Sequence, residues 1–171
     1  MRKCEICDLP QLLSFYRHVS EDTPGMPVYG KWIYGLHPTD ELIREYVRSG
    51  GMYCLEEAGE IAAAVAVVRA QDEDYSDVSW QRELADTEVV TVHLLAVAPE
   101  YQNRGLAEKL MQEVMGLARD AGIKAIRLDA VASNEPAHRL YQRLGFIKVD
   151  IKNWYACNTG WADFFLFEYL L

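Results

Sequence analysis

The strand, turn, helix and strand between Val89 and Ala130 constrain the fold of this chain more than any other feature of its sequence. Val89 to Ala98 is apolar and rich in valine, as in a buried strand, and Arg104 to Ala121 repeats apolar residues at helical spacing. Gly122 ends that helix, and Lys124 to Ala130 predicts a second strand. Strands joined by one helix lie parallel with a right-handed crossover. The sequence therefore predicts an α/β chain with a parallel strand pair.

Further strands and helices are predicted on both sides of this unit. Met52 to Glu56 and Ile61 to Arg69 would form one hairpin through Ala58-Gly59, and Phe146 to Tyr155 would pair with Trp161 to Leu171. The last of these strands is apolar on both faces, which predicts a place inside the sheet. We also expect a first strand over Arg2 to Cys7, helices starting at Asp8, at Pro38-Thr39 and over Asn134 to Leu144, and a helical turn or two in Val78 to Ala85.

Length, charge and cysteine spacing exclude several classes of protein. A chain of 171 residues predicts one domain over residues 1–171. A net charge of -9 argues against a nucleic-acid partner, which needs a basic surface. The apolar runs Ile61 to Val68 and Phe164 to Leu171 are too short to span a membrane, and a cytoplasmic location is the default. Cys4 and Cys7 have half the spacing of a zinc site without a second pair, so no metal is expected.

The turn from Gln102 to Ala107 is the sharpest local feature, and it lies between a strand and a helix. A helix N-terminus offers unpaired N–H groups and the positive end of a dipole, so it can bind an anion. Gly105 and Ala107 keep side chains small where a phosphate oxygen would approach, and Arg104 could contact a phosphate. The turn lacks the patterns of a P-loop or a Rossmann turn. The alternative is that Gly105 only relieves crowding at the helix start.

Two blocks in the second half of the chain follow a known pattern. Leu94 to Tyr101 leads into Gln102, Gly105 and Ala107, which match the signature Gln/Arg-x-x-Gly-x-Gly/Ala. The second block, an Asn…Ala…Leu-Tyr…Leu-Gly-Phe helix, is matched by Asn134, Ala137, Leu140, Tyr141, Leu144, Gly145 and Phe146. With both blocks at the right separation, the chain resembles the GNAT superfamily of N-acetyltransferases. The resemblance implies a mixed, mostly antiparallel central sheet with a splayed parallel strand pair and helices on both faces.

The resemblance also implies acetyl-CoA as a co-substrate. Its pantetheine arm would lie in the splay against backbone groups near Leu95, Ala96 and Val97. Asn134 would contact the arm, although a plain N-cap also explains this residue. N–H groups of the turn would hold the pyrophosphate, and the residues concerned are Gln102, Asn103, Arg104, Gly105, Leu106 and Ala107.

Tyr141 is expected to take part in the chemistry. A thiolate leaves when an amine attacks the thioester, and a phenol of pKa ~10 can protonate it at neutral pH. The alternative is that Tyr141 only packs with Ala137 and Leu144 on one helix face.

The incoming amine must lose a proton, because alkyl ammonium ions have a pKa of ~10. Candidate bases are Glu88 and His93 on the strand before the turn and Asp129 on the next strand. A purely structural role is the alternative for His93 and for Asp129.

The acceptor site is expected between the first two helices and the closing hairpin. Aromatic rings would wall it, from Trp32, Tyr34, Tyr155 and Trp161. Asp129 and the acidic loop Gln71 to Glu88, with Asp72, Glu73, Asp74 and Asp77, would lie nearby. Rings and carboxylates suit a cationic amine, so a small-molecule primary amine is the predicted acceptor. The alternative is that these rings belong to the core and the loop is solvated.

The predicted function is acetyl transfer from acetyl-CoA to a primary amine, by direct attack in a ternary complex. Protein N-termini and lysine side chains are alternative acceptors. A non-catalytic acyl-CoA-binding or regulatory module is a second class, and a structural interaction domain is a third, which leaves Gln102 to Ala107 unexplained. Homodimers are common in the family, and the sequence does not fix the oligomeric state.

Overall fold

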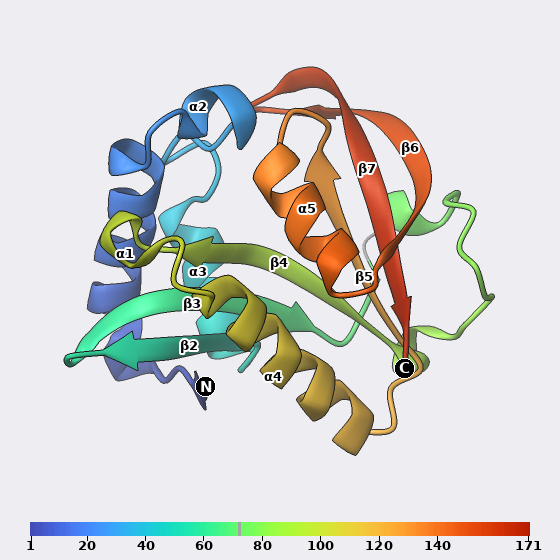
Figure 1. Ribbon diagram of the computed structural model, residues 1–171, viewed down its shortest axis with the longest axis horizontal. Helices are drawn as coiled ribbons and strands as arrows, with labels where there is room; N and C mark the ends of the chain where they lie inside the picture. The colour runs from blue at the N-terminus through green and yellow to red at the C-terminus, as the bar shows by residue number, and fades with distance from the viewer. Residues whose placement is uncertain (72) are drawn as a thin grey trace.

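A seven-stranded sheet in the order β1-β2-β3-β4-β5-β7-β6 forms the centre of the computed structural model, which describes residues 1–71 and 73–171 (Figure 1). The strands are β1 (Arg2–Lys3), β2 (Met52–Glu57), β3 (Glu60–Val68), β4 (Val89–Val97), β5 (Ala125–Val131), β6 (Ile147–Ala156) and β7 (Gly160–Leu170). Strands β4 and β5 run parallel, and the other neighbours are antiparallel. The expected mixed sheet with one parallel pair is confirmed, and β7 lies inside it as its two apolar faces predicted.

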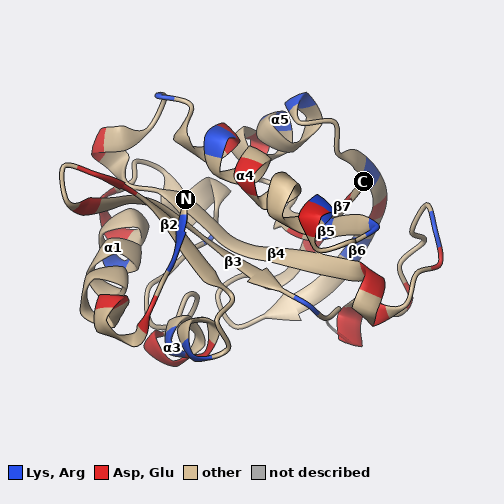
Figure 2. Ribbon diagram, turned by 90° about the horizontal axis from the view of Figure 1, so that it is seen from below, with Lys and Arg blue, Asp and Glu red and all other residues tan. Residues whose placement is uncertain are grey.

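Helices cover both faces of the sheet (Figures 1 and 2). The α-helices are α1 (Leu9–Asp22), α2 (Met26–Tyr29), α3 (Asp40–Arg48), α4 (Leu106–Asp120) and α5 (Glu135–Arg143). Short 3-10 turns are η1 (Ile6–Asp8), η2 (Glu73–Tyr75), η3 (Asp86–Glu88) and η4 (Pro99–Tyr101). Helices α4 and α5 share one apolar cluster with the sheet, which defines the α4–α5 face. Helices α1 and α3 share another on the opposite side, the α1–α3 face.

Two predicted elements differ from the structure. The first strand ends at Lys3 instead of Cys7, because the Asp8 carboxylate accepts a hydrogen bond from the Glu5 backbone N–H at 2.7 Å and starts η1. Cys4 is therefore buried, whereas Cys7 is exposed.

Val78 to Ala85 contains no helix. The Ser79 N–H donates to the Asp150 carboxylate at 3.2 Å, and the Gln81 N–H donates to Glu168 at 2.8 Å. These backbone groups bond to side chains of the sheet, which takes the place of helical bonds.

Strands β4 and β5 separate after a short parallel stretch. Their register pairs Val89, Val90 and Thr91 with Ala125, Ile126 and Arg127. Further along, Leu94 has a φ of +50°, and two residues of β4 stand opposite one residue of β3. The buried Tyr16 hydroxyl donates to the Leu94 carbonyl at 2.9 Å and fixes this bulge. A bulge bends its strand, so the fold opens a gap between β4 and β5 from Val92 onward.

Candidate active site

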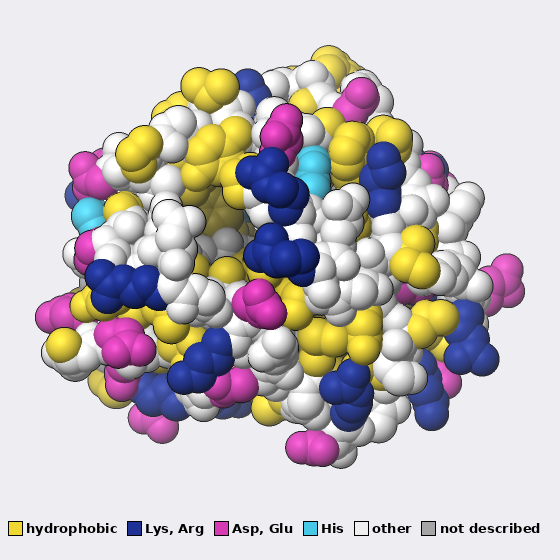
Figure 3. Space-filling model, viewed as in Figure 1, with side chains coloured by type: hydrophobic (Ala, Val, Ile, Leu, Met, Phe, Trp, Pro, Cys, Tyr) yellow, Lys and Arg dark blue, Asp and Glu magenta, His cyan; other side chains and the backbone are white. Residues whose placement is uncertain are grey.

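A cavity of about 620 Å³ lies where β4 and β5 separate. Leu106 and Tyr141 line it from the α4–α5 face, whereas Trp32 and Tyr46 line it from the α1–α3 face. The cavity therefore reaches both faces of the sheet. Figure 3 shows the α4–α5 face hollowed between α5 and the first two helices.

The predicted anion-binding turn lies at the α4–α5 end of this cavity. Asn103 and Gly105 have φ of +60° and +78°, and Gly105 is the N-cap of α4. A Cβ built on Gly105 meets no atom within 4 Å. Glycine is therefore favoured here by the left-handed backbone conformation, and relief of crowding does not explain it. The first N–H groups of α4 have no acceptor within the helix, so they can bind an anion at the cavity.

Two long side chains of this turn hydrogen-bond to the backbone of the preceding residues. The Gln102 amide donates to the Val97 carbonyl at 3.2 Å, which fixes the turn to the end of β4. The Arg104 guanidinium donates to the Glu100 carbonyl at 2.7 Å and lies over the Tyr101 ring at 5.2 Å. Gln102 lines the cavity, but Arg104 is not among the residues that do. The structure thus gives Arg104 a contact with the preceding 3-10 turn.

Tyr141 enters the cavity from α5. Its ring packs against Phe146 and Phe167 at centroid distances of 5.8 and 5.4 Å, so the packing interpretation holds for the ring. The residue also lines the cavity and is 6% exposed. Burial, with the Asp129 carboxylate nearby, raises the pKa of the Tyr141 phenol. Tyr141 therefore stays protonated at neutral pH, as a proton donor must.

Asn134 caps α5 and lies at the cavity. Its side chain accepts a hydrogen bond from the Ala137 N–H at 3.3 Å, which confirms the N-cap. Asn134 also lines the cavity.

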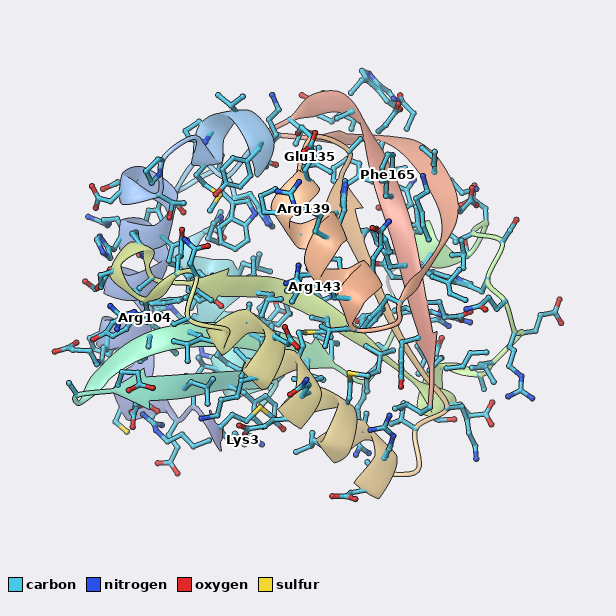
Figure 4. The ribbon with its side chains drawn as sticks, viewed as in Figure 1. Lys3, Arg104, Glu135, Arg139, Arg143 and Phe165 are labelled. Carbon is cyan, nitrogen blue, oxygen red and sulfur yellow. The ribbon has the colours of Figure 1, made fainter. Side chains whose placement is uncertain are left out.

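One basic side chain at the cavity was missed by the sequence. Arg143 lines the cavity at the C-terminal end of α5, facing the start of α4 (Figure 4). Its nearest carboxylate is Glu108, at 4.0 Å. Arg139, one turn earlier, pairs with Glu135 at 3.1 Å and is not among the lining residues. Helical periodicity distinguishes these arginines poorly, because both lie on the same side of α5.

Two histidines lie at the cavity on the α1–α3 face. His93 stacks on Tyr46 at 5.9 Å, and its Nε2 lies 3.1 Å from the Thr91 hydroxyl. His37 packs edge-on against Trp32 at 5.9 Å. Burial, and then the proximity of His93, lower the pKa of His37 to about 4. His93 was predicted here, but His37 was missed, because it follows an irregular segment without periodicity.

Asp129 and an aromatic group complete the α1–α3 face of the cavity. The Tyr75 hydroxyl donates to Asp129 at 2.7 Å, and the Tyr75 ring stacks on Trp154 at 6.1 Å. Asp74 lines the cavity beside them. The acidic loop of Gln71 to Glu88 therefore reaches the site, and Figure 2 shows its acidic residues next to the start of β4. Asp72 lies outside the described residues.

A buried ion pair holds this loop on the sheet. The Arg127 guanidinium donates to Glu168 at 2.8 Å and to the Arg82 carbonyl at 2.7 Å. Trp80 lies over the same guanidinium at 4.3 Å. Because the charges are paired and hydrogen-bonded away from water, they hold this part of the loop against the sheet.

The structure does not bring every predicted residue to the cavity. Trp32, Tyr155 and Asp129 line it, but Glu88, Tyr34 and Trp161 are not among the lining residues. The Glu88 carboxylate instead accepts the Ala85 N–H at 3.1 Å as part of the η3 cap. The Tyr34 hydroxyl donates to Asp40 at 2.7 Å. Trp161 is 72% exposed and contacts Tyr155 edge-on.

The described residues show neither a metal site nor a membrane span. Across 1–71 and 73–171, no group of three or more His, Cys, Asp or Glu side chains is arranged to hold a metal ion. Within the same residues, no helix has the length and apolar character needed to cross a bilayer.

The family model for the acetyltransferase (GNAT) family matches residues 12–146 of the chain. Two curated relatives are similar in part. One is the ribosomal protein bS18-alanine N-acetyltransferase of Escherichia coli strain K12, with 34% identity over 74 residues, 43% of this chain and 50% of that protein. The other is N-alpha-acetyltransferase 30 of Schizosaccharomyces pombe, with 35% identity over 80 residues, 47% of this chain and 51% of that protein. The matches thus span about half the length of these relatives.

Solved structures share the whole fold. The structure of yncA from Salmonella typhimurium with its cofactor acetyl-CoA superposes with a TM-score of 0.73 and 16% identity, covering 99% of this chain and 92% of that one. At this identity the likeness shows a common fold.

Proposed function

The chain belongs to the acetyltransferase (GNAT) family, and we propose that it transfers an acetyl group from acetyl-CoA to a primary amine by direct attack in a ternary complex. The observation that carries the proposal is the cavity between β4 and β5. It joins a helix N-terminus and a protonated tyrosine on one face of the sheet to carboxylates and imidazoles on the other. Such a passage lets a thioester and an amine meet from opposite sides.

The α4–α5 face fits the acyl-CoA. Leu95, Ala96 and Val97 line the cavity along the stretch of β4 beyond its pairing with β5. Their strand could bond the amide groups of a pantetheine arm as it would another strand. The turn that ends at Gly105 offers N–H groups to a pyrophosphate, and Arg143 adds a cation at the cavity. These residues would hold acetyl-CoA, which supplies an activated acetyl group.

Tyr141 would protonate the departing thiol. As the amine nitrogen bonds to the acetyl carbon, the carbon–sulfur bond breaks and the sulfur needs a proton. The phenol carries one, since burial keeps its pKa above the usual value. Its ring is held between Phe146 and Phe167, so the hydroxyl is positioned before substrate binds.

His93 would accept the proton of the acceptor ammonium, and Asp129 would bind its charge. Both line the cavity on the α1–α3 face, whereas Glu88 does not. The Thr91 hydroxyl donates to the Ala70 carbonyl at 2.9 Å, so it can only accept from His93 Nε2–H. Neutral His93 therefore carries its proton on Nε2, which leaves Nδ1 as its acceptor nitrogen. The Asp129 carboxylate, held by Tyr75, would bind the ammonium charge.

The acceptor that we propose is a small cationic amine. Asp74 and Asp129 supply negative charge, and the rings of Tyr75 and Trp154 lie beside them. Carboxylates with aromatic faces bind ammonium groups well. A second candidate is the N-terminal amine of a protein, which the names of the two partly similar relatives favour.

Thiol release would test the proposal directly. The purified protein would be mixed with acetyl-CoA and one acceptor at a time: a diamine, an amino sugar, or a peptide with a free N-terminus and no lysine. A melting curve runs in parallel. Release with the small amines supports the proposal, and release with the peptide alone favours the second candidate. A raised melting temperature without any release indicates a binding module. If acetyl-CoA neither raises the melting temperature nor releases thiol with any acceptor, the proposal is refuted.

A further inference from the structure

A second cavity lies at the other end of β4 from the candidate active site. Its volume is about 480 Å³, which is within the range of small-molecule sites. Its lining residues come from β1, the turn before β2, the end of β3, the start of β4 and the end of α4. No described residue lines both cavities. The second cavity is therefore separate from the proposed acetyl-transfer site.

The floor of the second cavity is apolar. Val67 and Val90 are buried on the sheet, and Ala118 of α4 is buried against the same cluster. Leu117 lines the cavity from α4 and is 39% exposed, which makes it one of the large apolar side chains that the fold leaves partly in water. A ligand with an apolar body would cover this surface and release the water from it.

Two basic side chains line the same cavity from separate strands. Lys3 of β1 stands opposite Tyr53 of β2, and Figure 4 shows Lys3 beside β2. A Cβ built on Gly50 would collide with Lys3 Nζ, so the ammonium lies directly against this glycine. Arg69 follows the end of β3 and also lines the cavity. Two cations from different elements therefore border one apolar floor.

Neither cation has an acidic partner within residues 1–71 and 73–171. No hydrogen bond or ion pair there involves the Lys3 ammonium or the Arg69 guanidinium. Glu113, one helical turn before Leu117 on α4, pairs instead with the Met1 amino group. The chain has 26 acidic and 17 basic residues, so acidic side chains are plentiful, yet none in the described residues pairs with these two cations. An anion bound between them would supply the missing negative charge.

We propose that the second cavity binds a small molecule that carries one carboxylate on an apolar body. The carboxylate would lie between the Lys3 ammonium and the Arg69 guanidinium, which both donate hydrogen bonds to carboxylates. The apolar body would lie on Val67, Val90 and Leu117. A bare inorganic anion would leave the apolar floor uncovered, and an uncharged apolar molecule would leave both cations unpaired. The inference goes beyond the proposed function and does not rest on it.

Three probes would separate the two parts of this site. Hexanoate carries both the charge and the apolar body, hexanol carries only the body, and acetate carries only the charge. Each is titrated into the full chain, and backbone amide NMR shifts give the dissociation constant. Hexanoate is expected to bind about tenfold more tightly than hexanol, since an exposed charge contact is worth up to about fivefold. It should also bind about tenfold or more tightly than acetate, which lacks the buried methylene groups.

The position of the site is tested in the same titrations. The amides that shift with hexanoate should be those of residues 49–51, 67–69 and 117–123, which surround the second cavity. Saturating coenzyme A should leave the dissociation constant of hexanoate unchanged, because the two cavities share no described lining residue.

Four variants divide the contributions of charge and apolar contact. Lys3→Gln and Arg69→Gln should each weaken hexanoate about threefold to fivefold and leave hexanol unchanged. Both residues are exposed, so the variants should fold. Leu117→Ala should weaken hexanoate and hexanol by the same factor, because it shortens only the apolar wall. Lys109→Gln is the matched control, since it removes an exposed charge from α4 that lines neither cavity.

Equal affinities for hexanoate and hexanol would overturn the inference. So would an affinity for hexanoate that the double variant of Lys3→Gln and Arg69→Gln leaves unchanged. Displacement of hexanoate by coenzyme A would show that the probe occupies the cavity between β4 and β5, and this result would also overturn the inference.

Discussion

The two faces of the cavity are built in different ways. The α4–α5 face is made from two continuous stretches, the end of β4 with the turn and first residues of α4, and α5 with its N-cap. The α1–α3 face is assembled from residues 29–37, α3, the acidic loop and the β6–β7 hairpin. The first face depends on local backbone conformation, and the second depends on contacts between distant segments. A short sequence pattern can therefore specify the first but not the second.

The same contrast appears in how each face is held. The turn at Gly105 is held by its own backbone, with a φ of +78°. Asp129 is instead held by the hydroxyl of Tyr75, which lies 54 residues away in the chain. Substitutions on the two faces should therefore fail in different ways. The predictions below use this contrast, from the largest effect to the smallest.

Tyr141→Phe is expected to lower kcat by about a hundredfold or more, because a positioned acid contributes on that scale. The acetyl-CoA dissociation constant should change little, since the ring and its contacts with Phe146 and Phe167 are kept. Steady-state rates and calorimetry measure the two quantities. Tyr169→Phe is the control, because its hydroxyl accepts from Arg119 at 3.0 Å. A wild-type kcat for Tyr141→Phe would show that Tyr141 is not the acid that protonates the thiol.

His37 should make the protein less stable in acid. Burial lowers its pKa in the folded state to about 4 from 6.5. A lowered histidine pKa means that the unfolded chain binds the proton first, so stability is lost as pH falls from 6.5 toward 4. His37→Gln should remove about 1 kcal/mol or more of this acid sensitivity, seen in urea unfolding at pH 8 and pH 5.

His18 provides the control of opposite sign. Its pairing with Glu100 at 3.0 Å and Asp22 at 2.7 Å raises its pKa. Its contribution is therefore present below pH ~6.5 and lost as pH rises, so His18→Gln should cost stability at pH 5 and little at pH 8. Equal acid slopes for the wild type and His37→Gln would show that His37 is not buried in this way.

The same glycine-to-alanine change should act with opposite signs at two places in α4. Gly105→Ala should lower the free energy of unfolding by about 1–2 kcal/mol, because alanine resists a φ of +78°. It should also weaken acetyl-CoA binding by moving the first N–H groups. Gly116→Ala should raise the free energy of unfolding by about 1 kcal/mol, because an added Cβ meets nothing within 4 Å in the helix. If both substitutions changed the free energy of unfolding in the same direction, the turn at Gly105 would not have the left-handed conformation.

The smallest expected effect separates two arginines of α5. Arg143 and Arg139 have similar side-chain exposures of 60% and 61%, but only Arg143 lines the cavity. Arg143→Ala should raise the acetyl-CoA dissociation constant about threefold, as expected for a solvent-exposed charge contact. Arg139→Ala should leave it unchanged. Calorimetry at low and high salt measures the dissociation constant of each variant. Equal effects of the two substitutions would show that Arg143 does not contact the anionic part of acetyl-CoA.

Much of the fold followed from the sequence because its signals are local. Helical spacing in Leu106–Asp120 and the two apolar faces of Gly160–Leu170 each depend on residues close together in the chain. The strand over Arg2 to Cys7 was wrong because Asp8 caps the Glu5 N–H. The helical turn in Val78 to Ala85 was wrong because its N–H groups bond to Asp150 and Glu168, which lie far along the chain.

The sequence by itself determined the turn at Gly105, the N-cap at Asn134 and the place of Tyr141 on its helix, since backbone conformation and helical period are set by neighbouring residues. Tertiary structure alone decided which side chains meet on the α1–α3 face. It brought His37 to the cavity, paired the Tyr75 hydroxyl with Asp129 and bonded the Asn158 amide to the Lys31 carbonyl. Those contacts cross tens to more than a hundred residues, and packing of the whole core selects them, so no short pattern encodes them.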